Sequence, residues 1–135
     1  MFFQDGYKWK FELPPATITL SVCEKKAGGI KKFTTYKLTS DKTGKSVERR
    51  YNNFLWLNQR LSEQFPLIAL PYLPEKQMSG RFDSLFLGYR SRQLERYINY
   101  CTHHPILGSC ELMKFFLENP GEVKSVNIFL FYFIF

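Results

Sequence analysis

Residues 46–65, SVERRYNNFLWLNQRLSEQF, contain the point at which the pattern of apolar residues changes its period. Up to Tyr51 the stretch is typical of a β-strand, and after it a helical spacing begins. The apolar residues with this spacing are Phe54, Leu57, Leu61 and Phe65. Asn52 or Asn53 is placed to cap the start of the helix, and Pro66 ends it. The stretch therefore predicts a strand that leads directly into a helix.

Two further strands are predicted before this one. Residues 17–22 alternate polar and apolar side chains, and residues 30–39 are rich in Thr, Tyr and Phe. Glycine-containing turns at residues 27–29 and 40–44 separate the strands. Because short turns join strands that are consecutive in the chain, we expect an antiparallel meander of three strands.

Helices are predicted for the rest of the folded part. The longest helical pattern runs from about Phe82 to His104, and a last one runs from Ser109, which can cap it, to about Asn119. Residues 66–80 contain three prolines, and stiff polyproline-like geometry fits them best. Three strands followed by helices predict an α+β fold, in which a three-stranded antiparallel sheet packs against a helical subdomain with a proline-rich loop.

The length of 135 residues fits one domain, and the hydrophobic content of 44% argues against disorder. We expect an N-terminal extension at residues 1–15, in which aromatics alternate before Pro14-Pro15 stops any regular element. A folded domain is expected at residues 16–120 and an apolar tail at residues 121–135. Ile128 to Phe135 is a run of eight apolar residues, well below the roughly 20 that span a bilayer. The tail is interpreted as a truncated or alternative end, an extra strand, or a shallow membrane insertion.

Positive charge is concentrated in one part of the chain. The formal net charge is +7, and residues 25–50 hold nine lysines or arginines against two acids, Asp41 and Glu48, which is the same surplus. This concentration indicates an anionic partner (nucleic acid, a membrane surface or an acidic protein) or else a solvated lysine-rich hairpin. The three cysteines lack the spacing of a disulfide framework, and the residues after Met1 do not resemble a secretory signal. Both observations favour an intracellular, reduced protein.

Arg90 is expected to face the interior. On a helical wheel at about 100° per residue it falls in the middle of an apolar stripe. The stripe consists of Phe86, Leu94, Tyr97 and Cys101. A guanidinium facing the core requires an anionic partner, because an unpaired buried charge costs several kcal/mol. That partner is either a carboxylate of the protein, such as Glu48 or Glu63, or a bound phosphate.

Two more segments carry cations beside aromatic or proline residues. Arg49-Arg50-Tyr51 stands where the last strand meets the first helix. Arginine engages phosphate oxygens through a planar fork, and a tyrosine ring offers a face to a sugar ring. In residues 70–76, LPYLPEK, two prolines limit the freedom of the chain before Lys76. We interpret these cations and Arg90 as parts of one site for a polyanionic ligand.

Three of these stretches resemble a known family. They are Arg50-Tyr51-Asn52-Asn53-Phe54, the pattern Leu70-Pro71-x-x-Pro74-x-Lys76, and Arg90 before Leu94 and Tyr97. Together they resemble the phox-homology (PX) domain of the sorting nexins, over roughly residues 16–119. Residues 73–82, with Gly29-Ile30-Lys31 and His104-Pro105, look most like the subgroup that also carries an SH3 and a BAR domain. The resemblance implies a three-stranded antiparallel sheet on a helical subdomain, in agreement with the pattern of elements.

The resemblance implies a phosphoinositide site. Arg50 would bind the 3-phosphate, and Tyr51 would lie beneath the inositol ring. Lys76 would hold the 1-phosphate, and Arg90 would bind the 4- and 5-hydroxyls or a phosphate there. Phosphatidylinositol 3-phosphate is the first expected ligand, with bisphosphorylated species as the alternative.

The resemblance also implies a membrane-bound role. Arg49 and Arg81 would be accessory cations, and Met78 would enter the bilayer interface. Asn53 departs from the family pattern, since many members have an acid there, but it lies outside the expected pocket. We expect a peripheral membrane module of endocytic or endosomal traffic, cytoplasmic and monomeric as this chain, whose partners are phosphoinositide membranes and trafficking proteins.

Other classes of function fit less well. Cys101, His103, His104 and Cys110 contain no C-x-x-C pair, so a zinc site is not expected. Paired carboxylates at a useful spacing and a glycine-rich phosphate loop are also missing, so we expect no enzyme, metal or cofactor. Nucleic-acid binding through Phe33 and Tyr36 would leave an inward-facing Arg90 unexplained. Protein interaction through the proline-rich loop stays open as an alternative.

Overall fold

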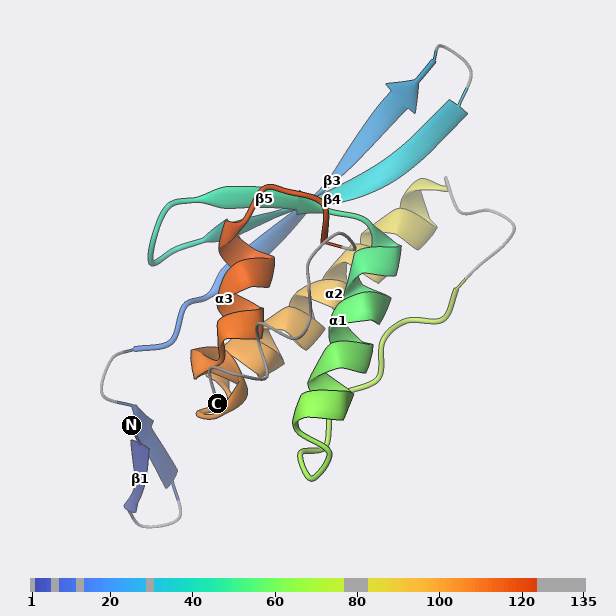
Figure 1. Ribbon diagram of the computed structural model, residues 1–135. Coiled ribbons are helices and arrows are strands. Elements are labelled where there is room, and N and C mark those ends of the chain that lie inside the picture. Colours follow the sequence, from blue (N-terminus) through green and yellow to red (C-terminus); the bar gives the residue numbers. More distant parts are fainter. Residues whose placement is uncertain (1, 6–7, 12–13, 29–30, 77–82, 124–135) are drawn as a thin grey trace.

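The computed structural model describes residues 2–5, 8–11, 14–28, 31–76 and 83–123. Its main sheet has three antiparallel strands in the order β3 (Ile18–Ala27), β4 (Lys31–Ser40) and β5 (Ser46–Arg49). Each strand pairs with the next one in the chain (Figure 1). The predicted three-stranded meander is therefore confirmed.

A second, two-stranded sheet precedes the main one. Strands β1 (Phe2–Asp5) and β2 (Lys8–Phe11) pair antiparallel, with Phe2 opposite Phe11. Two of the alternating aromatic residues of the expected N-terminal extension, Trp9 and Phe11, thus lie in a strand, which we did not predict.

The helices are α1 (Tyr51–Gln64), α2 (Ser84–His103) and α3 (Glu111–Glu118), with a short 3-10 helix, η1 (Leu107–Ser109), before α3. They lie on one side of the sheet, and the far end of the β3–β4 hairpin extends beyond them (Figure 1). The predicted α+β architecture is confirmed. Within the described residues, no helix is long and apolar enough to cross a bilayer.

Two helix starts differ from the prediction by one or more residues. Arg50, rather than Asn52 or Asn53, is the N-cap of α1. The Asn53 side-chain oxygen accepts the Arg50 N–H at 2.7 Å, and the Asn53 N–H donates to the Arg50 carbonyl at 2.9 Å. Cys110, rather than Ser109, caps α3, because its sulfur accepts the Met113 N–H at 3.4 Å.

The core joins the sheet to all three helices. Its largest fully buried residues include Ile18, Tyr36 and Leu38 from the sheet and Phe54, Leu57, Leu94, Tyr97 and Phe116 from the helices. Phe54 of α1 meets Phe116 of α3 edge to face, with ring centroids 5.3 Å apart.

Helix α2 is fixed against the edge of the sheet by polar side chains. Asn99 accepts the Ile18 N–H and donates to the Ile18 carbonyl, each at 2.8 Å, and Glu95 accepts the Leu20 N–H at 2.8 Å. These bonds satisfy edge groups of β3 that would otherwise lack a partner. They also set the position of α2, and with it the position of Arg90.

Candidate functional site

Arg90 faces the interior, as its place on the helical wheel predicted. The residue is only 6% exposed, and Leu94, Tyr97 and Cys101 of the same stripe are fully buried. The guanidinium carbon lies 3.9 Å from the centroid of the Tyr51 ring and 4.4 Å from that of the Phe86 ring. One terminal nitrogen, Nη2, donates to the Glu75 carbonyl at 3.0 Å.

The carboxylates considered as partners of Arg90 are engaged elsewhere. Glu48 pairs with Lys25 at 3.1 Å, and Glu63 pairs with Arg60 at 3.0 Å. Across residues 14–28, 31–76 and 83–123, Arg90 forms no ion pair with an acid, and its Nε atom is buried without a hydrogen-bond partner. The alternative of an internal salt bridge to Glu48 or Glu63 is therefore wrong.

Tyr51 connects the start of α1 to the proline-rich loop. Its hydroxyl donates to the Pro74 carbonyl, and its side chain is 9% exposed. Burial raises the pKa of Tyr51, while the charge of Arg90 lowers it by less, so the hydroxyl stays protonated at neutral pH. Tyr51 and Arg90 thus each hold one of two consecutive loop carbonyls, those of Pro74 and Glu75, and the exposed Lys76 follows directly.

Arg50 stands at the N-terminal end of α1, next to Tyr51. Its side chain is exposed, and its guanidinium carbon lies 4.8 Å from the centroid of the Phe33 ring of β4. The helix N-terminus adds partial positive charge to this place. The structure therefore gathers Tyr51, Arg90 and the loop before Lys76, with Arg50 adjoining them through the chain.

Arg49 is not available as an accessory cation, and this expectation is corrected. The residue is 2% exposed, and its guanidinium donates to four backbone carbonyls. These belong to Glu48, Phe116, Asn119 and Gly121. Burial lowers the pKa of Arg49 to about 10, which still leaves it charged at neutral pH. Its role is to hold the end of α3 and the segment after it against β5.

The other two residues expected at the site, Arg81 and Met78, lie outside the described residues. Description resumes at Asp83, whose carboxylate accepts the N–H groups of Leu85 and Phe86 at 2.9 and 3.2 Å. Asp83 is therefore the N-cap of α2, and its carboxylate caps the first turn of the helix, which contains Phe86.

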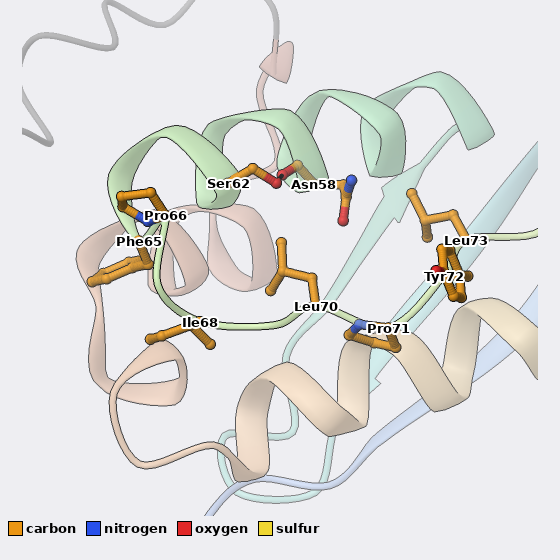
Figure 2. A pocket seen from close by; sticks show the side chains of 9 residues that line it. All are labelled: Asn58, Ser62, Phe65, Pro66, Ile68, Leu70, Pro71, Tyr72 and Leu73. Carbon is orange, nitrogen blue, oxygen red and sulfur yellow. Dashed lines mark hydrogen bonds between the residues drawn. The ribbon is translucent and has the colours of Figure 1, made fainter.

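A separate pocket of about 290 Å³ lies between α1 and the segment that follows it (Figure 2). Asn58 and Ser62 of α1 line one side, and residues 65, 66, 68 and 70–73 line the rest. None of these lining residues is charged, so the pocket does not suit a phosphate group.

The cysteines and histidines do not gather into a metal-binding group in the parts of the chain that the structure describes. No cluster of three or more metal-ligating side chains occurs there. Cys101 and Cys110 are fully buried, and burial raises the pKa of Cys101 to about 12, so its sulfur is a thiol at neutral pH.

Three aromatic residues lie close to the cations in a way that we did not predict from the sequence. Phe86 precedes Arg90 by one helical turn, so its contact with the guanidinium follows from helical spacing. Phe33 and Tyr36 lie on β4, and their contacts with Arg50 and Arg90 depend on how the sheet packs on the helices. Local sequence carries no signal for these two.

Comparison with known proteins shows which family this chain resembles. The PX domain family matches residues 37–120. Sorting nexin-18 of Mus musculus is 38% identical over 122 residues, and sorting nexin-33 of Homo sapiens is 39% identical over 115 residues. These matches cover 89% and 84% of this chain but only 20% of either relative, so the chain spans about a fifth of the length of these sorting nexins.

Two solved structures share the fold. A designed CISK-PX domain superposes with a TM-score of 0.65 at 31% identity, covering 74% of this chain and 96% of that one. The SNX-BAR Mvp1 tetramer superposes with a TM-score of 0.69 at 32% identity, covering 82% of this chain and 32% of that one. Together with the family match over residues 37–120, they show that this chain belongs to the PX domain family.

Proposed function

We propose that this chain is a phosphoinositide-binding module that brings its protein to membranes of the endocytic and endosomal system. The observation that supports this most strongly is the buried Arg90 guanidinium, which has no acidic partner among the described residues and lies beside the loop before Lys76. A buried cation without a counter-charge is costly, and a bound phosphorylated headgroup would offset that cost.

The roles of the residues follow the family pattern. Arg50, exposed at the start of α1, binds the 3-phosphate, and Lys76 binds the 1-phosphate. Arg90 binds the 4- and 5-hydroxyls or a phosphate at those positions. Since only 9% of Tyr51 is exposed, its main effect is to support Arg90 and Pro74, and its contact with the inositol ring is small.

Phosphatidylinositol 3-phosphate is the proposed ligand, with bisphosphorylated species next. Arg49 does not contribute to binding of either, because it is buried and bonded to backbone carbonyls. Exposed lysines that form no ion pair with an acid among the described residues, such as Lys37 and Lys45, add attraction to an anionic leaflet of about 1 kcal/mol for each cation that approaches it. Met78 remains the proposed insertion residue. We place the protein in the cytoplasm and on endosomal, vesicle or plasma membranes, with binding rather than catalysis as its activity.

Protein binding at the proline-rich segment is the second candidate. Tyr72 is 99% exposed and lines the uncharged pocket of Figure 2, which favours contact with an apolar side chain of a partner. Docking of the loop as a free polyproline ligand is disfavoured, because Pro74 is buried and its carbonyl accepts from Tyr51.

Vesicle flotation tests the proposed function. Phosphatidylcholine vesicles that carry each phosphorylated phosphatidylinositol in turn are floated with the parent protein and with Arg50→Gln, Lys76→Ala and Arg96→Gln. We expect the first two variants to lose specific binding while keeping the parent's circular dichroism, and Arg96→Gln, a substitution on α2 away from the site, to bind like the parent. Equal flotation of all four proteins, or tighter binding to an oligonucleotide at the same salt concentration, contradicts the proposal.

A further inference from the structure

Two buried polar groups beside the proposed site lack hydrogen-bond partners. Tyr36 of β4 is 1% exposed, and its hydroxyl makes no hydrogen bond within the described part of the chain. The Nε atom of Arg90 is likewise buried and has no hydrogen-bond partner among the described residues. An unsatisfied buried polar group is uncommon in folded proteins, and each one calls for a physical explanation.

The two groups belong to neighbouring side chains. Tyr36 lies opposite Arg49 in the β4–β5 pair, and Arg49 stands two residues before Tyr51, whose ring contacts the Arg90 guanidinium. Burial raises the pKa of Tyr36, and the charge and the N–H groups of Arg90 lower it by less. The hydroxyl is therefore protonated at neutral pH and lies within the influence of the guanidinium. A tyrosine oxygen can accept a hydrogen bond, while an arginine Nε–H can only donate one, so the pair is complementary.

The other contacts of Arg90 do not use its Nε–H. Nη2 is held by the Glu75 carbonyl at 3.0 Å, and the planar group lies against the rings of Tyr51 and Phe86. The two ring contacts use the face of the planar group and none of its N–H donors. The Nε–H is therefore the donor left for the Tyr36 hydroxyl.

We propose that Tyr36 is a positioning residue of the headgroup site. Its hydroxyl accepts the Nε–H of Arg90 when the terminal nitrogens leave the Glu75 carbonyl and turn to the bound headgroup. This inference rests on the proposed function, because Tyr36 would orient Arg90, the residue proposed to bind the 4- and 5-positions of the inositol ring. It adds a residue of the sheet to a site otherwise built from helix ends and a loop.

A double-mutant cycle tests the proposal. The affinity for vesicles with phosphatidylinositol 3-phosphate is measured for the parent, Tyr36→Phe, Arg90→Lys and the double variant. Tyr36→Phe removes only the hydroxyl, and we expect about tenfold weaker binding, the usual effect of one hydrogen bond to a charged group. Lysine has no Nε–H, so Tyr36→Phe should change little in the Arg90→Lys background. Tyr97→Phe is the matched control, because it also removes a buried hydroxyl, one that donates to Asn58 at 2.7 Å.

Each outcome of the cycle either supports or overturns the proposed role of Tyr36. Parent-like binding by Tyr36→Phe, a tenfold loss that persists in the Arg90→Lys background, or an equal loss in Tyr97→Phe overturns the role of Tyr36 but leaves the proposed function intact. Failure of the parent itself to bind overturns both. A measurement on the parent covers the case in which Tyr36→Phe unfolds. In nuclear magnetic resonance spectra, soluble short-chain phosphatidylinositol 3-phosphate should slow the solvent exchange of the Arg90 Nε–H, and unchanged fast exchange refutes the inference.

Discussion

Replacing Arg90 with methionine should remove ligand binding at little cost to the fold. The substitution loses one hydrogen bond to the Glu75 carbonyl, worth about 1.5–3 kcal/mol, and two contacts with aromatic rings, worth about 0.5–2 kcal/mol each. It relieves the desolvation of a buried cation, several kcal/mol, and an unsatisfied Nε, about 1–3 kcal/mol. Because these terms are of similar size, we expect the free energy of unfolding of Arg90→Met to lie within about 1.5 kcal/mol of the parent.

Arg49→Met is the matched comparison, because the two arginines are buried to a similar degree, 2% and 6% exposed. Arg49 donates to four backbone carbonyls, whereas Arg90 donates to the carbonyl of Glu75. Burial lowers the pKa of Arg49 to about 10, so Arg49→Met also relieves desolvation, but it removes more hydrogen bonds, and these decide the difference. We expect Arg49→Met to be less stable than Arg90→Met by at least about 3 kcal/mol.

Urea unfolding followed by circular dichroism measures both free energies, and vesicle flotation measures binding. The account predicts a stable Arg90→Met variant that does not float and an unstable Arg49→Met variant. A cost of about 3–5 kcal/mol for Arg90→Met, the usual effect of breaking a buried ion pair, would show that Arg90 serves the fold rather than a ligand.

Three further predictions follow from single contacts. Phe33→Leu removes the ring next to the Arg50 guanidinium, so it should weaken vesicle flotation about three- to fivefold without a change in thermal midpoint. Asn53→Ala removes the acceptor of the Arg50 N–H and should cost about 1 kcal/mol in urea unfolding, while Asn53→Asp keeps the acceptor and the stability. His104 accepts the Ile106 N–H through Nδ1, and burial lowers its pKa. The folded state therefore binds fewer protons than the unfolded state, and stability should fall as pH drops below about 6.5, an effect that His104→Asn should remove in urea titrations at several pH values.

The order of elements could be predicted because each carries a clear period. The alternation of residues 17–22 and the helical spacing from Phe54 onward indicated the first strand and the first helix, and the stripe on α2 placed Arg90 in the interior. Helix starts were predicted less accurately. The side chain at the third helical position, here Asn53, can accept a hydrogen bond from the N-cap residue, so an asparagine near a helix start is not always the N-cap itself. The short pair β1–β2 was missed because four-residue strands give little pattern.

The site was predicted only in part, for reasons of geometry. The burial of Arg49 could have been foreseen, because alternate residues of a strand share a face and Arg49 shares the buried face of Val47. The proximity of Tyr36 to Arg90 could not have been foreseen. It depends on how β4 and α2 are placed in the fold, and these two elements are far apart in the chain. Hydrogen bonds from Tyr51 and Arg90 to loop carbonyls are likewise invisible to a local pattern.

Calorimetric titration with soluble short-chain phosphatidylinositol 3-phosphate tests the central claim most directly, because it needs no membrane and reports only the headgroup site. The account predicts saturable binding with one ligand per chain for the parent protein and none for folded Arg90→Met. No saturable heat with the parent, or equal affinity of the methionine variant, would contradict it.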